Sequence, residues 1–100
     1  MKFLVRFKNK KVKESVSLLP LLEQKKLYNL IDDLEKNGPI QKGWKNYSPL
    51  GKNKFHCHLT YKWVACWEYI EEISLETGKS FTTIRIIEVY YAGSRENAPY

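Results

Sequence analysis

The sequence has no apolar run near the ~20 residues that a membrane-spanning helix needs. Its 2 cysteines in 100 residues exclude the dense disulfide framework of small secreted domains. The opening residues Met1 to Arg6 are too short and too charged for a secretory signal peptide. We therefore expect one domain over residues 1–100, in the reducing cytoplasm, with free thiols and no membrane partner.

Acidic residues are absent from one long interval of the sequence: no Asp or Glu lies between Glu35 and Glu68. The interval holds six lysines and six aromatic residues, in a chain whose formal net charge is +6. Ammonium groups neutralise phosphates and rings stack on unpaired bases, so this composition favours single-stranded nucleic acid. A basic surface that only keeps the protein soluble is the simpler alternative.

The residues that we assign to RNA binding on this basis lie in or beside the acid-free interval: Lys42, Trp44, Lys45, Lys52, Lys54 and Lys62. Trp44 and Tyr47 are the preferred stacking residues because they fall in a predicted loop. Aromatic residues in the predicted strands more commonly belong to a core.

Hydrophobic periodicity predicts an α+β domain. Residues 2–7 alternate charged and apolar, which is typical of a strand. Helical spacing predicts a short helix over about 10–18 and a second helix, with Pro20 in its first turn, that stops at Asn37-Gly38-Pro39. Residues 39–53 are predicted as a loop. Strands follow over 55–60, 63–73 and 81–91, with turns at 61–62 and 76–79 and an irregular tail over 92–100.

The expected fold is thus an N-terminal strand, a two-helix hairpin on one sheet face, and a three-stranded antiparallel meander. Within it, His56 and His58 share one face of a strand and Cys57 faces the other way. Two imidazoles at this spacing can bind a metal, but Cys66 is the only further ligand candidate. We favour proton transfer, since an unperturbed histidine pKa lies near ~6.5. Two strand histidines without a task are the simpler alternative.

Two further candidates lie near the end of the sequence. Arg95 follows a predicted strand and Gly93, from where an arginine can reach over the sheet and hold a phosphate that gains charge. A surface ion pair with Glu96 or Glu88 is its alternative role. Tyr100 is either frayed or held in place for a purpose.

These residues resemble the RelE/ParE superfamily of bacterial toxin–antitoxin toxins. The resemblance is carried by Gly38-Pro39, the run Leu50–Leu59, Trp63–Trp67 and the run Glu88–Glu96. It covers the order of elements along the whole chain and is sequence-specific in the second half. It implies a RelE-like βααβββ fold.

The resemblance further implies a toxin that is a metal-independent, cofactor-free endoribonuclease (an mRNA interferase). Such enzymes cut messenger RNA on the ribosome, inhibit translation and are silenced by a cognate antitoxin, here expected to be acidic. The messenger's 2′-hydroxyl attacks the adjacent phosphate, which requires a proton acceptor, a proton donor and a cation.

Carried over by position, His56 and His58 stand where the family often has two lysines. Arg95 stands at its last-strand arginine, and Tyr100 lies near its C-terminal tyrosine. An arginine that is common early in the third strand falls near Val64 here, so that cation is missing.

The same alignment places Val64 and Cys66 on the face of the histidines, whereas Trp63, Ala65 and Trp67 face the helices. Cys57 then belongs to the core, so a disulfide between the two cysteines is not expected. Two other functions stay open on this scaffold. One is a ParE-like inhibitor of DNA gyrase, and the other is a non-catalytic RNA-binding or regulatory module.

Overall fold

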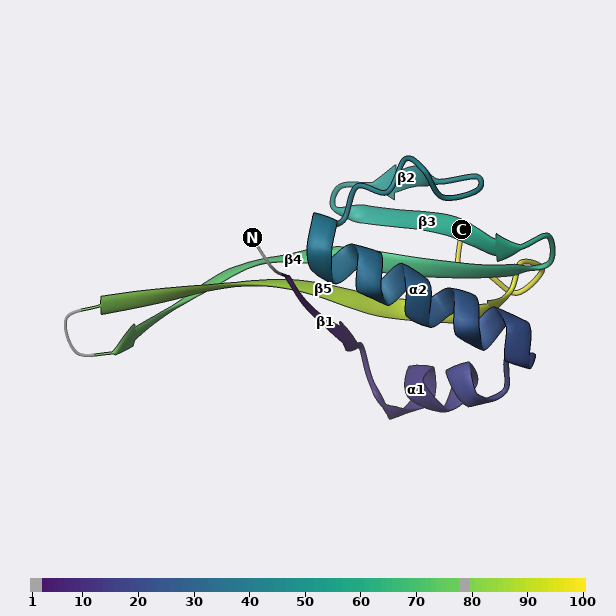
Figure 1. The fold of residues 1–100 in the computed structure, drawn as a ribbon, viewed down its shortest axis with the longest axis horizontal. Coiled ribbons are helices and arrows are strands. Elements are labelled where there is room, and N and C mark those ends of the chain that lie inside the picture. Colours follow the sequence, from purple (N-terminus) through teal and green to yellow (C-terminus); the bar gives the residue numbers. More distant parts are fainter. Residues whose placement is uncertain (1–2, 78–79) are drawn as a thin grey trace.

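The structure is a computed structural model that describes residues 3–77 and 80–100, with side chains described outside residues 71–83. Two helices and five strands are arranged in an α+β fold (Figure 1). In chain order the elements are β1 (Leu4–Phe7), α1 (Lys10–Ser17), α2 (Leu21–Asn37), β2 (Ser48–Gly51), β3 (Lys54–Thr60), β4 (Trp63–Thr77) and β5 (Ser80–Ser94).

The strands form one mixed sheet in the order β1-β5-β4-β3-β2. β1 runs parallel to β5, and every other neighbouring pair is antiparallel. The expected three-stranded meander was therefore too small, because β2 adds a fourth strand and β1 joins the opposite edge. β2 was mistaken for loop because it is short and contains Pro49 and Gly51. Both residues are tolerated at a sheet edge, and the register there is irregular.

The helix predictions are confirmed to within a residue or two. The side chain of Asn9 caps α1 by accepting the Val12 N–H at 2.9 Å. α2 ends where Gly38 adopts φ +89° and donates its N–H to the Leu34 carbonyl oxygen at 2.9 Å. A Cβ at Gly38 would lie 2.9 Å from the ring of Phe3, so this stop requires glycine.

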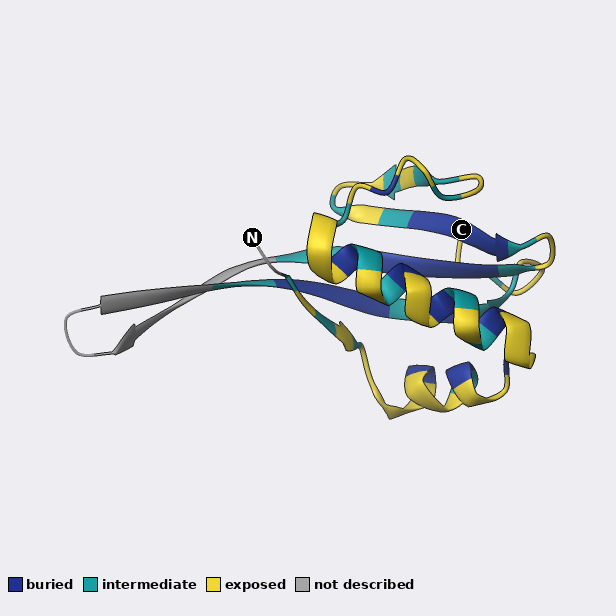
Figure 2. Cartoon of the chain, in the orientation of Figure 1, coloured by how far each residue is buried: buried dark blue, intermediate teal, exposed yellow. Residues whose placement is uncertain are grey.

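The core lies between the helices and one face of the sheet. The stripe Leu27, Leu30 and Leu34 of α2 is fully buried, and Val12 and Val16 of α1 join it. The strands contribute Cys57, Leu59, Ala65, Trp67, Ile87, Val89 and Ala92. Figure 2 shows the buried stretches of β3, β4 and β5, with α2 crossing in front of β4 and β5. Each large apolar side chain buried in this way contributes about 1.5–3 kcal/mol to stability.

The β3–β4 register decides which side chains face away from the helices. His56 is opposite Cys66, and His58 is opposite Val64, whereas Cys57 is opposite Ala65 in the core. Directly opposed residues share a face. The predicted face assignment is therefore confirmed, and both cysteines are buried free thiols.

The β4–β5 hairpin is longer than predicted and projects beyond the helices as a two-stranded arm (Figure 1). Residues 76 and 77 belong to β4, while residues 78–79 of the predicted turn lie outside the described residues. β5 continues past Gly93 because Ser94 still pairs with Trp63. In the part of the chain that is described, no helix is long and apolar enough to cross a membrane.

Candidate functional site

The four predicted catalytic residues gather on the sheet face opposite the helices and at its edge. The ring centroids of His56 and His58 are 6.0 Å apart, and the ring of Tyr100 lies 4.4 Å from that of His56. The positive charge of Arg95 acts on both His58 and Tyr100. Segments from β3 and from the region after β5, distant in sequence, thus supply one site.

His56 is held in place by the edge strand β2. Its Nδ1 lies 3.1 Å from the Ser48 hydroxyl oxygen and 3.3 Å from the Ser48 carbonyl oxygen. A carbonyl oxygen only accepts, so this contact favours the tautomer that carries its proton on Nδ1. Nε2 is then the ring nitrogen available for proton exchange. The sequence does not point to Ser48 as part of the site, because its local pattern predicts a loop over residues 39–53.

His58 is 7% exposed, and its Nδ1 is a buried polar atom without a hydrogen-bond partner among the described residues. Burial lowers the pKa of His58, and the charges of His56, Arg95 and Lys45 lower it further. The imidazole is therefore neutral at pH 7 and can accept a proton. An unpartnered buried nitrogen is costly in a folded protein, which makes His58 the most distinctive group on this face.

Tyr100 covers the His56 ring while remaining 53% exposed. Burial and the proximity of Cys66 raise the pKa of the Tyr100 hydroxyl, although Arg95 opposes the shift. The hydroxyl therefore stays protonated at neutral pH and can donate a hydrogen bond to a bound anion. The predicted alternative of a frayed residue does not describe this placement.

Cys66 lies beside His56 on the same sheet face, as predicted, and Tyr90, which was not assigned to the site from the sequence, forms a hydrogen bond with Cys66. Burial raises the pKa of Cys66 to about 12, while a hydrogen bond with Tyr90 opposes that shift. Burial also raises the pKa of Tyr90. Both groups are neutral at physiological pH, so they add no charge to the site.

Arg95 is positioned by the turn between β3 and β4. Its backbone N–H donates to the Lys62 carbonyl oxygen at 2.7 Å, and its guanidinium carbon lies 5.9 Å from the Tyr61 ring centroid. Glu88, one alternative partner, instead accepts from Arg6 at 3.0 Å. Within the described residues Arg95 has no ion pair, so its guanidinium is available to an anionic ligand.

The five lysines assigned to RNA binding are all exposed. Lys45 lies beside His58, because its carbonyl oxygen accepts the His58 N–H at 2.8 Å and its charge lowers the His58 pKa. The ammonium of Lys54 lies 5.7 Å from the Tyr90 ring centroid. Lys52 and Lys62 occupy the turns at the two ends of β3, and Lys42 lies in the loop before β2.

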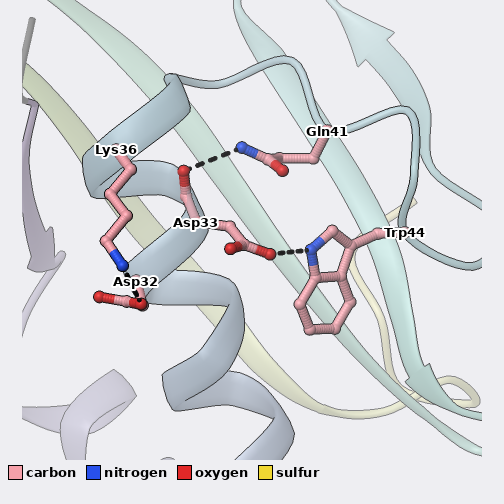
Figure 3. A network of polar contacts seen from close by, with 5 residues as sticks. All are labelled: Asp32, Asp33, Lys36, Gln41 and Trp44. Atoms are coloured by element: carbon pink, nitrogen blue, oxygen red, sulfur yellow. Dashed lines mark hydrogen bonds and ion pairs between the residues drawn. The ribbon is translucent and has the colours of Figure 1, made fainter.

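Trp44 and Tyr47 do not join this site. The Trp44 indole N–H donates to the Asp33 carboxylate of α2 at 2.9 Å, and Gln41 of the same loop donates to the Asp33 carbonyl oxygen at 3.2 Å (Figure 3). Tyr47 stacks on Phe55 and packs against the hydrophobic core. The loop folds back on the helix and half-buries both rings, so the geometry does not support the prediction that they stack on bases.

The described residues contain no group of three or more His, Cys, Asp or Glu side chains that could hold a metal ion. Comparison of the chain with protein-family models, with curated proteins and with solved structures found no match. A function must therefore be argued from the site itself: two imidazoles, a guanidinium, a phenol and a rim of ammonium groups on one side of a sheet.

Proposed function

We propose that the protein is a RelE-type toxin, an endoribonuclease that cleaves messenger RNA on the ribosome and so inhibits translation. The observation that carries the proposal is the grouping of the His56 and His58 imidazoles on one sheet face, close to the charge of Arg95. A neutral imidazole beside a cation provides a proton acceptor where a phosphate is held. The resemblance of the sequence to this family supports the same activity.

The reaction uses groups that are already assembled. The RNA 2′-hydroxyl gives its proton to His58 as its oxygen attacks the adjacent phosphorus, while Arg95 stabilises the charge on the phosphoryl oxygens. The bond from phosphorus to the 5′-oxygen breaks, and that oxygen takes the Nε2 proton of the His56 imidazolium, which is left neutral with its remaining proton on Nδ1. The products are a 2′,3′-cyclic phosphate and a 5′-hydroxyl. Tyr100 orients His56 and the scissile phosphate.

The rim of lysines suits the substrate. Lys45 and Lys54 flank the imidazoles, and the exposed Lys52 and Lys62 extend the positive surface to both ends of β3. Ammonium groups in such a row follow a phosphodiester backbone and draw it to the site without reading sequence. Their removal should weaken RNA binding and reduce its dependence on salt.

A second function has one observation in its favour. Val64 stands where the family often has an arginine, and it is fully buried next to His58 in the register. The loss of this cation suits a non-catalytic RNA-binding or regulatory module on the same scaffold. Such a protein would retain RNA affinity and lack cleavage. No comparable observation favours inhibition of DNA gyrase.

We also propose that the partner in the cell is a small acidic antitoxin. The basic surface around His58 is exposed and bears the charge that an acidic segment would neutralise. A segment that orders on binding would cover the lysines and block RNA at once. Both partners and the ribosome would then meet in the cytoplasm.

The test of cleavage uses purified protein, ribosomes and a translated messenger, with cuts mapped by primer extension. We expect discrete cuts inside the translated region, abolished by His58→Ala combined with Arg95→Ala. Circular dichroism and a melting curve check the fold of the variant, and Lys25→Ala on the exposed face of α2 serves as control.

Undiminished cutting by the double variant would overturn the site assignments. RNA binding without cuts would favour the non-catalytic module. Loss of supercoiling in a parallel gyrase assay, with translation intact, would favour the ParE-like alternative.

A further inference from the structure

A cavity of about 450 Å³ lies at the end of the sheet where the β3–β4 turn meets the segment after β5. Its walls are Tyr61, Lys62, Trp63, Ser94, Arg95 and Glu96. The proposed reaction uses only Arg95 of these six, so the remaining lining needs another explanation. Its volume falls in the range that protein sites for small organic groups occupy.

The cavity is held open by backbone contacts between its two walls. Trp63 pairs with Ser94 in the β4–β5 register, and the Arg95 N–H donates to the Lys62 carbonyl oxygen at 2.7 Å. The Tyr91 hydroxyl donates to the Ser94 carbonyl oxygen at 2.6 Å and fixes the same segment. The walls are therefore pre-organised, which lowers the cost of binding a ligand.

The chemistry of the lining fits a planar, partly polar group. Tyr61 is 68% exposed in a turn, so most of its ring is accessible to a ligand. Trp63, half-buried against the core, lines the same wall as Tyr61, and the Arg95 guanidinium carbon lies 5.9 Å from the Tyr61 ring centroid. Rings and a guanidinium plane at this spacing are the platforms on which unpaired bases stack.

The charge of the cavity lining favours a base over a phosphate as the bound group. Glu96 lines the cavity, and its negative charge would repel an anion placed inside it. The same carboxylate accepts hydrogen bonds from an exocyclic amino group. The cations Lys62 and Arg95 stand beside it, where they can hold the flanking phosphates of the same strand.

We propose that this cavity binds one base of single-stranded RNA, stacked on Tyr61, next to the nucleotide whose phosphate Arg95 holds. The inference rests on the proposed function and adds to it a base-binding subsite that gives the enzyme a sequence preference. Arg95 links the two, since its charge reaches His58 and its guanidinium lies over Tyr61. Glu96 makes a base with an amino group preferred over uracil.

The first test measures binding without cleavage. A fluorescent 2′-O-methyl octaribonucleotide, which cannot be cut, is titrated against the full protein and followed by anisotropy. We expect Tyr61→Ala to weaken binding about 5- to 150-fold, the usual effect of losing one stacked base. Tyr61→Phe keeps the ring and should stay within about threefold of the wild type. Tyr28→Ala removes another exposed ring, from α2, and should leave RNA binding unchanged.

The second test separates the base from the backbone. Oligo(C) and oligo(U) are both pyrimidines of similar stacking, and only cytosine carries an amino group. Oligo(C) should bind more tightly than oligo(U), and Glu96→Ala should bring the two affinities together. A preference that survives Glu96→Ala would remove the carboxylate from the subsite.

Failure of the subsite and failure of the proposed function give different results. If Tyr61→Ala binds like the wild type while Lys54→Gln binds more weakly, the cavity is not a base site, although RNA binding stands. If the wild type shows no saturable binding, the subsite proposal is overturned even where cleavage on ribosomes persists. If ribosomal cleavage is absent and Tyr61→Ala still weakens RNA binding, the subsite stands and the nuclease proposal falls.

Discussion

The ring of Tyr100 lies against the ring of His56, with centroids 4.4 Å apart and planes inclined at 48°. His56 comes from β3 in the middle of the chain, and Tyr100 from the segment that returns over the sheet after β5. On its other side the same imidazole contacts Ser48 of β2. His56 is thus fixed between two segments that the linear sequence keeps far apart.

Replacement of Tyr100 should therefore act through His56. Tyr100→Ala removes the ring contact, and we expect cleavage to fall about 10²-fold, as small displacements of a reacting group commonly do. Tyr100→Phe preserves the ring and should restore most of that loss. Single-turnover cleavage rates on ribosomes measure both effects. Equal rates for Tyr100→Ala and the wild type would show that the contact does not serve the reaction.

The lowered pKa of His58 sets the direction of the pH dependence. A base acts in its neutral form, so on the acid side the cleavage rate should decline only below ~6.5, as pH falls through the lowered pKa of His58. Lys45→Gln removes one charge that lowers this pKa and should move the decline to higher pH. NMR titration of the imidazole checks the shift directly. Lys25→Gln, on α2, should leave the profile unchanged.

The same histidine links stability to pH. Between the lowered folded pKa and ~6.5, the unfolded chain binds more protons at this position than the folded protein does. The free energy of unfolding should therefore decrease as pH falls through that window, and His58→Gln should reduce the decrease. Urea unfolding at a series of pH values measures both slopes. Identical slopes in the two proteins would contradict the assignment.

Trp44 is expected to stabilise the fold without binding RNA. Trp44→Phe loses the hydrogen bond to Asp33, and we expect the free energy of unfolding to drop by about 1 kcal/mol. Asp33→Ala should cost a similar amount, and the double variant should lose less than the sum of the two. RNA affinity should not change. A clear loss of RNA affinity in folded Trp44→Phe would return this ring to the RNA surface.

Both thiols should be inert in the native protein. Burial raises the pKa of Cys57 to about 12 and that of Cys66 to about 12, so almost no thiolate exists at pH 8. Reaction with a disulfide reagent should be slow in buffer and complete in denaturant. Fast native reaction of one thiol would indicate that the sheet opens near that residue.

The predictable parts of the fold are those with a strong local pattern. The stripe of α2 and the alternation in β3 both reflect one buried face, so element type and the side on which the histidines lie could be read from the sequence. β2 has no such pattern, since Pro49 and Gly51 signal a turn in any local view. Only pairing with β3 makes it a strand.

The site likewise contains residues that the sequence predicts and residues that it does not. His56, His58 and Arg95 stood out by residue type and position, whereas Ser48, Tyr61 and Tyr90 acquire a role only through tertiary contacts. Trp44 shows how tertiary contacts change the surroundings of a residue that a local view places in a loop. A tryptophan in a polar loop reads as exposed, but the loop folds back and Asp33 binds its N–H.

The parallel pairing of β1 with β5 joins Leu4 to Ile86 and Phe7 to Val89 across most of the chain. Contacts between residues so far apart in the sequence form late in folding, because closing the long loop between them costs entropy before the contacts can stabilise the chain. While the protein is being synthesised, β1 and α1 have no sheet to pack on until β5 has left the ribosome. The imidazoles and Arg95 therefore come together only after β5 and the segment behind it have emerged, so the growing chain carries no assembled site before that point.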